Sequence, residues 1–70
     1  MKLHYYPETD SLYIDLNSRP GVDVLEVAEG LVVDIDAAGN VVGIDIEHAS
    51  KLLDLATLES EGLPVVADRA

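Results

Sequence analysis

Apolar and polar residues alternate with a period of two through most of the first fifty positions, and this pattern limits the fold more than any other feature. Such alternation is typical of antiparallel strands that bury only one face. In one segment, Leu12, Ile14 and Leu16 share a side while the other side is polar. Five segments show the pattern, at about residues 2–6, 12–16, 22–28, 31–36 and 41–47. The sequence therefore predicts an antiparallel sheet of four to five strands over about residues 2–47.

Runs rich in Pro, Gly, Asp and Asn separate these segments and predict turns. The clearest is the last of them, Ala-Ala-Gly-Asn, where Gly39 is the candidate for a positive φ. A four-residue turn there would place Ile35 opposite Val42, which keeps the apolar sides of both strands together. A three-residue loop with a bulge would instead turn the acidic side of the last strand inward, at a high desolvation cost. We therefore expect the four-residue turn, with Val33 opposite Ile44.

The pattern becomes helical after position 48. Leucines and alanines recur at helical spacing over about residues 51–60, which predicts a helix packed on the sheet. Ser50 is expected to cap its start, and Gly62 is expected to follow its end. The apolar stripe is wider than one thin sheet can cover, so Leu55 and Leu58 are expected to remain available to a second subunit. The predicted fold class is α+β.

The chain has 70 residues, enough for one domain with a thin core. A chain of this size buries only about 60% of the surface that its unfolded form exposes. It contains no Cys, which removes disulfides and thiolate metal sites as supports. We therefore expect a single domain over residues 1–61 that is stabilised as a homodimer. A short tail would follow at residues 62–70, where Val65 and Val66 could extend a sheet edge.

Fourteen acidic residues face four basic ones, for a formal net charge of −10. Binding to nucleic acids or anionic membranes requires clustered Lys and Arg, so neither is expected as a partner. A basic protein is the partner that this charge favours, because opposite fields speed encounter. The sequence shows no Cys, no signal-peptide pattern and no membrane-spanning apolar run, so we expect a cytoplasmic protein.

One acidic stretch resembles a calcium-binding loop. Asp34, Asp36 and Asp45 occupy positions one, three and twelve of the EF-hand pattern. Position five is Ala38, which has no ligating side chain, and the flanks alternate as strands where an EF-hand requires helices. A hairpin turn with solvated acids on its outer face explains the same residues. Together with Glu47, these acids are expected to form a charged surface that meets a basic partner or, as a less favoured alternative, a divalent cation.

No catalytic constellation is visible in the sequence. None of the serines has a base at a recognised spacing or lies in a G-x-S-x-G elbow. His4 and His48 are far apart in the sequence and lack Cys partners, so they do not suggest a zinc site. The sequence predicts no catalytic residue, no metal site and no cofactor.

Three stretches resemble a known prokaryotic family. Residues 6–14 (YPETDSLYI) are similar to the opening Y-x-P-E-x-D-x-L-Y-I of domain-of-unknown-function family 2283. Residues 29–36 (EGLVVDID) and 39–46 (GNVVGIDI) are similar to its block G-V-x-x-D-x-D-x-x-G-x-V-V-G-I-E-I, and the usual Ala-Ser ending follows. The resemblance covers about residues 3–50.

The resemblance implies a scaffold and no particular chemistry. The family has no established activity, cofactor or catalytic residue. Its shared residues are expected to build turns at Pro7, Asp10 and Gly39. Gly43 is expected to permit a close backbone approach, and Asp45 stands where Glu is common. Some members lie beside genes for small toxin-like proteins, which implies an antitoxin-like or accessory role.

Three functions follow from these expectations. The first is a non-catalytic protein-interaction module, homodimeric and antitoxin-like, that binds a basic, toxin-like protein. The second is a structural domain with no dedicated ligand. The third is a divalent-cation-binding domain that uses Asp34, Asp36, Asp45 and Glu47. The surfaces expected to carry the first function are those acids and the two helix leucines named above.

Overall fold

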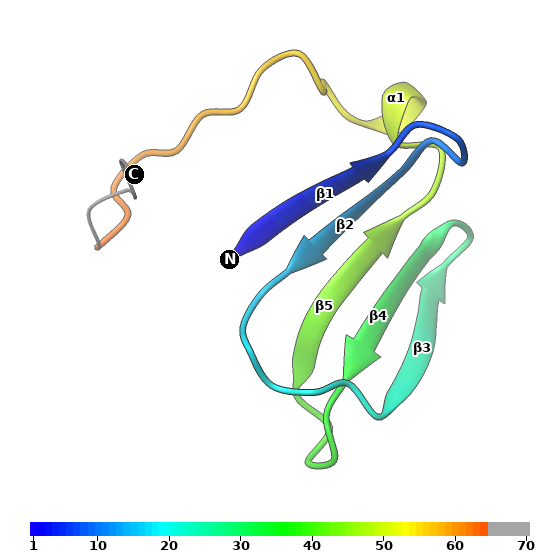
Figure 1. Ribbon diagram of the computed structural model, residues 1–70, viewed down its shortest axis with the longest axis vertical. Helices are drawn as coiled ribbons and strands as arrows, with labels where there is room; N and C mark the ends of the chain where they lie inside the picture. Colours follow the sequence, from blue (N-terminus) through cyan, green and yellow to red (C-terminus); the bar gives the residue numbers. More distant parts are fainter. Residues whose placement is uncertain (65–70) are drawn as a thin grey trace.

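The computed structural model describes residues 1–64, which form one five-stranded antiparallel sheet and one short helix (Figure 1). The strands are β1 (Lys2–Tyr6), β2 (Ser11–Asp15), β3 (Asp23–Ala28), β4 (Leu31–Ile35) and β5 (Val41–Ile46), and the helix is α1 (Ala49–Leu52). The strand order across the sheet is β1-β2-β5-β4-β3, and every neighbouring pair is antiparallel. The predicted antiparallel sheet is therefore confirmed, with five strands.

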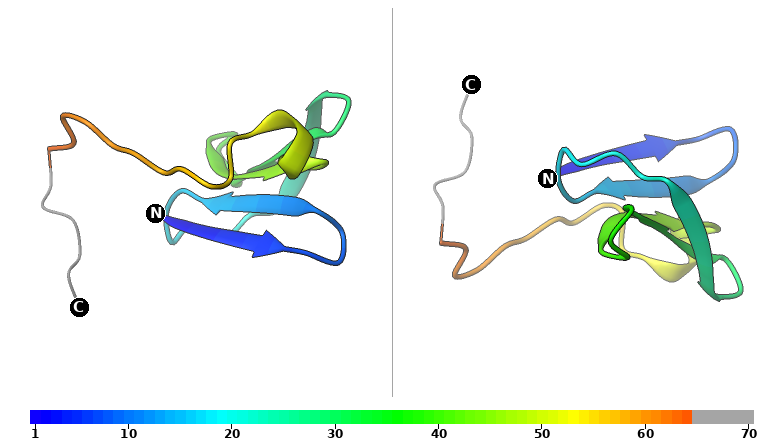
Figure 2. Two further views of the ribbon diagram at one scale, coloured as in Figure 1. Left: turned by 90° about the horizontal axis from the view of Figure 1, so that it is seen from above. Right: turned by 90° about the horizontal axis from the view of Figure 1, so that it is seen from below.

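The sheet combines a hairpin with a three-stranded meander. β1 and β2 pair through the turn at residues 7–10, and β3, β4 and β5 follow one another through short turns. The connection from β2 to β3 passes along one end of the sheet to its far edge, so β5 lies between β2 and β4 (Figure 1). The sheet is strongly twisted, with β3 running steeply across the direction of β1 (Figure 2). The last strand, β5, therefore joins the two halves of the sheet.

The register divides the strand residues into two faces. Ile44 of β5 pairs with Ile14 of β2 and with Val33 of β4, so these three side chains share one side. We call this side the apolar face; its members are Leu3, Tyr5, Leu12, Ile14, Leu25, Leu31, Val33, Ile44 and Ile46. The opposite side is the polar face; its members are Lys2, His4, Tyr6, Ser11, Tyr13, Asp15, Val24, Glu26, Val32, Asp34, Gly43 and Asp45. Apart from Asp23 at the start of β3, which lies on the same side as Leu25, the alternation in the sequence thus separates apolar from charged side chains across one sheet.

The turn between β4 and β5 holds three residues instead of the predicted four. Asp36 N donates a hydrogen bond to Asn40 O (2.9 Å) and Gly39 N donates to Asp36 O (3.0 Å), which leaves residues 37–39 as the loop. Gly39 has the predicted positive φ, 87°. A three-residue loop closed by a left-handed residue is a common hairpin form. The Asp36 side chain favours it, because its Oδ1 accepts from Ala38 N and Asn40 N at 2.9 Å each.

A bulge in β5 compensates for the shorter turn. The register shifts at the end of β4, so Ile35 lies opposite Val41 and the predicted pairing with Val42 is wrong. The extra residue returns the strand to its expected alternation, and Val33 lies opposite Ile44 as predicted. The rejection of a three-residue loop with a bulge was therefore wrong: this form is present, and because the bulge restores the alternation, the acidic side of β5 stays off the apolar face.

The helix predicted over residues 51–60 is much shorter in the structure. α1 stops after one turn, and Leu53 is already extended (φ −125°, ψ 152°). Asp54 then makes a turn, in which its side chain accepts from Ala56 N (3.2 Å). Such side-chain bonds to nearby backbone compete with a helix, and a short helix is marginal unless tertiary contacts stabilise it. Residues 53–64 therefore leave the sheet as a largely extended segment, without the predicted helical cover (Figure 1).

The core is thin, because no second layer covers the apolar face within residues 1–64. Three apolar residues are buried: Leu12, Val42 and Ala49, with 7%, 3% and 0% of their surface exposed. Leu25, on the apolar face of edge strand β3, remains 56% exposed. The short helix α1 lies at one end of the sheet, beside the β1–β2 turn (Figures 1 and 2). Domains normally stack a second layer on such a face, so this side of the molecule is open.

The C-terminal part of the chain is described only as far as residue 64. Gly62 has a positive φ of 69°, but it lies well beyond α1 and does not end the helix as predicted. Val65 and Val66, which were considered as an extension of a sheet edge, lie outside the described residues. Among residues 1–64, no helix is long and apolar enough to cross a membrane.

Candidate functional site

Asp10 ties the β1–β2 turn to the start of α1. Its Oδ2 accepts from Ser50 Oγ at 2.7 Å, and its Oδ1 accepts from Ser50 N at 3.1 Å and from the Tyr5 hydroxyl at 2.7 Å. Its backbone oxygen accepts from Ala49 N at 2.9 Å. Asp10 adopts a φ of 54°, in the left-handed region that Asp tolerates better than most residues. Asp10, predicted as a turn residue, thus also fixes the start of α1 against the β1–β2 turn.

These bonds change the titration of both partners. Hydrogen bonds from Ser50 and then Tyr5 stabilise the carboxylate and lower the pKa of Asp10 from its ordinary value. The same contact raises the pKa of Tyr5, because Asp10 accepts the phenol proton in a hydrogen bond. Ser50 was predicted to cap the helix, and this is wrong. His48 occupies the N-cap position with a φ of 54° and makes no side-chain capping bond.

Tyr13 reaches across β5 to β4 on the polar face. Its hydroxyl donates to Asp34 Oδ2 at 2.6 Å, and Gly43 of β5 lies beneath the ring. A Cβ at Gly43 would overlap the phenol of Tyr13, so the predicted close approach is made by a side chain. The bond to Asp34, followed by burial and the charges of Asp15 and Asp45, raises the pKa of Tyr13 to about 12. Three strands that follow one another across the sheet are thereby joined by one side chain.

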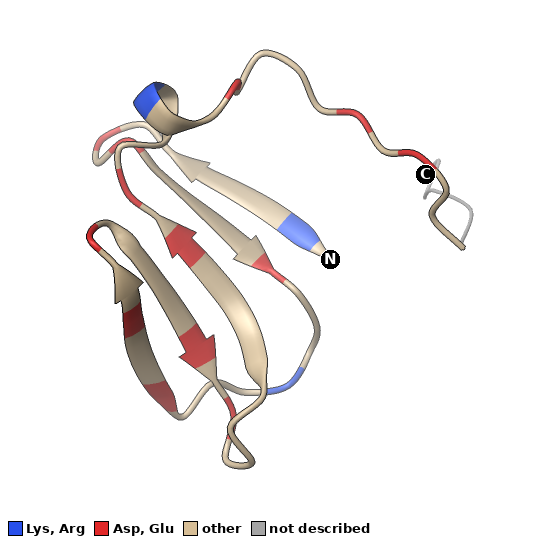
Figure 3. Cartoon of the chain, turned by 180° about the vertical axis from the view of Figure 1, so that it is seen from behind, with Lys and Arg blue, Asp and Glu red and all other residues tan. Residues whose placement is uncertain are grey.

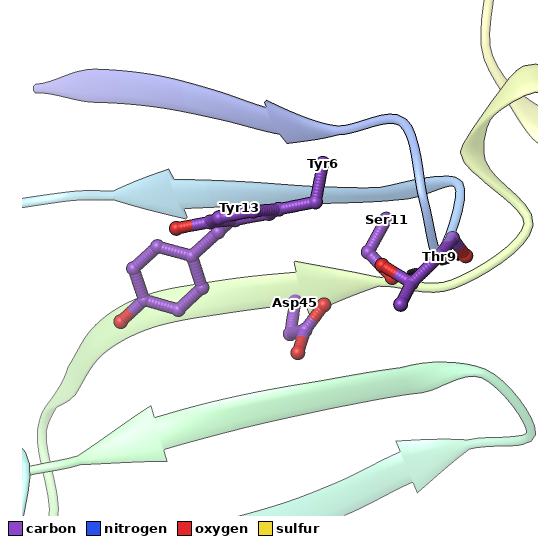
Figure 4. Close-up of a pocket in the computed structure, with 5 residues that line it drawn as sticks. All are labelled: Tyr6, Thr9, Ser11, Tyr13 and Asp45. Carbon is purple, nitrogen blue, oxygen red and sulfur yellow. Dashed lines mark hydrogen bonds between the residues drawn. The ribbon is translucent and has the colours of Figure 1, made fainter.

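A hollow of about 370 Å³ lies next to this contact on the polar face (Figure 4). Its lining residues are Tyr6, Thr9, Ser11, Tyr13 and Asp45. Asp45 lies opposite Tyr13 in the register, and in Figure 4 its side chain lies between the Tyr13 ring and Ser11. Asp45 Oδ1 is buried and has no hydrogen-bond partner among residues 1–64. The hollow therefore combines a carboxylate, hydroxyl groups and aromatic rings.

The four acids predicted as a charged surface divide into separate places. On the polar face, Asp34 accepts the hydrogen bond from Tyr13, and Asp45 lines the hollow beside this contact. Asp36 is bound into the β4–β5 turn, and Glu47 is exposed just beyond β5, where its N donates to Gly30 O (2.8 Å). Figure 3 shows acidic residues spread over several strands and turns. In the described chain, no three His, Asp or Glu side chains are grouped so that they could hold a metal ion.

Asp36 has its own electrostatic environment. Backbone N–H donors, with Asn40 contributing most, lower the pKa of Asp36 from its ordinary value. Arg19 Nη1 lies 3.9 Å from Asp36 Oδ2 and adds a weaker attraction. The Arg19 side chain is largely exposed, so this ion pair contributes little to stability. The carboxylate of Asp36 therefore stabilises the turn itself.

An apolar groove of about 610 Å³ separates the β1–β2 hairpin from the extended segment that follows α1. It is lined by Leu3, Tyr5, Leu12, Ile14, Leu53, Asp54, Leu55, Thr57 and Leu58. Leu55 and Leu58, predicted to remain available to a second subunit, border this groove and are 41% and 81% exposed. The groove continues the open apolar face.

The sequence pointed to some of these residues but not to the hollow. Tyr6 and Ser11 lie opposite each other across the β1–β2 hairpin, and Tyr13 shares their face. Two tyrosines and a serine on one side of a predicted hairpin were a usable signal. Nothing in the alternation could show that Tyr13 leans over Gly43, because the pairing of β2 with β5 is non-local.

A comparison with family models gives the chain its relatives. The model described as "Protein of unknown function (DUF2283)" matches residues 2–50, which contain all the strands and most of the polar-face contacts. No curated protein and no solved structure gave a match. Because the match spans most of the chain and ends just after the Ser50 contact to Asp10, this protein belongs to the DUF2283 family.

Proposed function

We propose that this domain is a non-catalytic protein-interaction module in which a second copy covers the apolar face and a basic protein meets the polar face. The observation that carries the proposal is the open apolar face, on which Leu12 alone of the defined members is buried. Exposed, contiguous apolar surface marks sites of protein interaction. Leu3, Tyr5 and Leu25 are each more than two-fifths exposed on this one side.

The exposed area supports a second copy as the occupant. The chain exposes 5630 Å², whereas a compact monomer of 7.5 kDa is expected to expose about 4,200 Å². Both the open apolar face and the extended residues 53–64 contribute to the excess. Association of two copies through the apolar face would remove its exposed side chains from water.

The distribution of charge is compatible with self-association. Among the strand residues that point to the apolar side, the acid is Asp23, at the start of edge strand β3. The acids Asp15, Asp34 and Asp45 lie on the opposite side of the sheet. Two copies that meet through their apolar faces would therefore keep most of their negative charge apart, which limits the repulsion of a net charge of −10 each.

The polar face supports the second half of the proposal. It presents carboxylates and tyrosines without a matching number of cations, and the chain has four Lys and Arg in all. A basic surface on another protein, such as a small toxin-like protein, would be complementary to it. The apolar face and the polar face would then bind independently.

Two neighbouring residues of β3 provide a matched test of the dimer. Leu25 lies on the apolar face and is 56% exposed, and Val24 lies on the polar face and is 62% exposed. Leu25→Glu should weaken dimerisation about a hundredfold or more, because it buries a charge in each copy. Val24→Glu adds the same charge on the other side and should leave the dimer intact. Sedimentation equilibrium at tens of micromolar measures both.

A monomeric wild-type protein at that concentration would contradict the dimer. Equal effects of Leu25→Glu and Val24→Glu would also contradict it, since they would place the contact elsewhere. Leu58→Glu tests the dimer at a third position, because Leu58 borders the apolar groove and is 81% exposed. Its replacement should weaken the dimer without destabilising the fold of the monomer.

A further inference from the structure

The hollow on the polar face is built from two hairpin strands and the last strand of the sheet. Its lining comes from β1 (Tyr6), the β1–β2 turn (Thr9), β2 (Ser11 and Tyr13) and β5 (Asp45). Its volume of about 370 Å³ lies at the lower end of the roughly 300–1,000 Å³ of small-ligand pockets. This is room for one extended side chain or a similarly small group.

The polar atoms of the hollow present acceptors. The Tyr13 hydroxyl donates its proton to Asp34, so its oxygen is left as an acceptor. The Ser11 hydroxyl donates to Thr9 O at 3.4 Å, which leaves the same capacity. Asp45 contributes a carboxylate, which in its ionised form accepts hydrogen bonds and donates none. A group that enters between Ser11 and Asp45 and carries only donors would find an acceptor on each of these two residues.

Asp45 also needs donors for its own sake. Its Oδ1 is buried and unpartnered among residues 1–64, and leaving a buried charged acceptor unmatched costs stability. The second torsion of an Asp side chain is soft, so the carboxylate can turn either oxygen toward the hollow. A bound cation would meet this demand, and no group of three acids is present in the described chain to favour a metal ion.

The two tyrosine rings favour a planar cation. The Tyr13 ring is held by its bond to Asp34 and by contact with Gly43, and Tyr6 stacks with His4 at a centroid distance of 6.4 Å and an interplanar angle of 24°. Rings that are fixed before binding lose little entropy on binding. A guanidinium group stacks on such rings and forms paired hydrogen bonds with a carboxylate, whereas an ammonium offers a point charge.

We propose that this hollow binds the guanidinium group of an arginine that a basic protein partner presents, with Asp45 as its counter-ion and Tyr6 and Tyr13 as its stacking walls. The inference rests on the proposed function in one respect: the arginine belongs to the basic protein that meets the polar face. It goes further by naming the residue type that the partner must place there and the five side chains that receive it.

The binding test uses a single side chain as the probe. N-acetyl-arginine amide is titrated into the ¹⁵N-labelled chain of 70 residues, with N-acetyl-citrulline amide as an uncharged probe of nearly the same shape. Shifts that saturate should concentrate at Tyr6, Ser11, Tyr13 and Asp45. The citrulline probe should give no saturable shift there, because it carries no positive charge.

Two variants with the same change in charge test the counter-ion. Asp45→Asn should weaken binding of the arginine probe by about tenfold or more, since it removes a charge-assisted hydrogen bond. Glu29→Gln removes an exposed carboxylate in the β3–β4 turn and should change binding less than about twofold. Asp45→Asn relieves an unmatched buried charge, so it should fold at least as well as the wild type, and a loss of binding would not report unfolding.

Several outcomes would overturn the inference. Equal shifts with citrulline, shifts spread evenly over the acidic residues, or unchanged binding by Asp45→Asn would each contradict an arginine site here. N-acetyl-lysine amide that binds more tightly than the arginine probe would contradict the stacking walls. None of these results depends on dimerisation, which sedimentation reports separately, so the arginine site and the dimer can fail one without the other.

Discussion

The two faces of the sheet differ in how many contacts the described part of the chain makes on them. On the polar face, Tyr13, Asp34 and Gly43 form a finished arrangement, with a 2.6 Å hydrogen bond and a ring packed on a bare backbone. On the apolar face, Leu25 stays more than half exposed, and the groove beside Leu55 is open. One face is specified by individual contacts, whereas residues 1–64 provide no surface that covers the other.

This difference separates what the sheet can do for itself from what it needs from a partner. Burial of apolar surface is non-directional and grows with area, so the apolar face gains from any well-fitting cover. Hydrogen bonds and ion pairs depend on geometry, so the polar face can distinguish one side chain from another. We therefore assign assembly to the apolar face and recognition to the polar face as the two halves of the proposed function.

The largest effect is expected from a change that disrupts the contact of Tyr13 with Asp34 and Gly43 on the polar face. Gly43→Ala places a Cβ where the Tyr13 phenol lies, so the ring must rotate away and release Asp34. We expect a loss of about 1–3 kcal/mol in the free energy of unfolding, typical of overpacking. Urea denaturation measures it. Unchanged stability would show that the ring does not need its place over Gly43.

Tyrosine absorbance provides a second measurement of the same contact. The pKa of Tyr13 is raised from 10.0 to about 12 in the folded protein. Its contribution to stability is therefore fully present below pH 10 and is lost as the pH rises toward 12. Tyr13→Phe should remove the ionisation near pH 12, and Gly43→Ala should move it toward 10. The double variant should cost less than the sum of both changes, because they disrupt one contact.

The strands were predictable because their cause is local. The alternation that places Leu12 and Ile14 on one side follows from a single half-buried face. The strand register confirms that side, because Ile44 lies opposite both Ile14 and Val33. The β4–β5 turn was not predictable in length, because the Asp36 side chain and a bulge together produced a shorter loop with the same faces. The loop has three residues where four were expected, and β5 contains one extra residue at the bulge. These two differences offset each other, so the side chains of β5 keep the expected faces.

The helix and the hollow show where sequence reasoning fails. Leucine spacing predicted ten helical residues after Ser50, but α1 ends at Leu52, and the Asp54 side chain accepts from nearby backbone in a turn instead. The Asp10 carboxylate accepts a hydrogen bond from the Ser50 hydroxyl, 40 positions away in the sequence. The Tyr13 hydroxyl donates to Asp34, 21 positions away. Such contacts require the strand order, which places β5 between β2 and β4 and which no local pattern encodes.

A smaller effect is expected at Asp10, whose network reaches the apolar face through Tyr5. Hydrogen bonds from Ser50 and Tyr5 lower the pKa of Asp10 below its ordinary 3.8. The stability that Asp10 contributes is therefore present above about pH 4 and is lost as the pH falls through its lowered value. Asp10→Asn keeps the shape and tolerates the same left-handed backbone, so it should fold and show a flatter loss of stability in acid.

Urea midpoints between neutral pH and about pH 2 measure this slope. Glu26→Gln serves as the control, because it removes an exposed carboxylate from edge strand β3, at the opposite edge of the sheet from the β1–β2 hairpin that carries Asp10. It should retain the acid dependence of the wild type. If Asp10→Asn also retains it in full, the bonds from Ser50 and Tyr5 do not favour the charged form of Asp10.

The smallest effect, in salt, gives the sharpest comparison because its sign should differ between the two faces. Each copy carries a net charge of −10, so screening should reduce repulsion between copies and strengthen the apolar dimer. The same screening should weaken the arginine probe at Asp45, where opposite charges attract. Between about 50 mM and about 500 mM NaCl, we expect changes of roughly two- to fivefold in opposite directions. Sedimentation and the probe titration measure the two constants on the same sample. A dimer that weakens in salt would be held by charge, which would move assembly from the apolar face to the polar one.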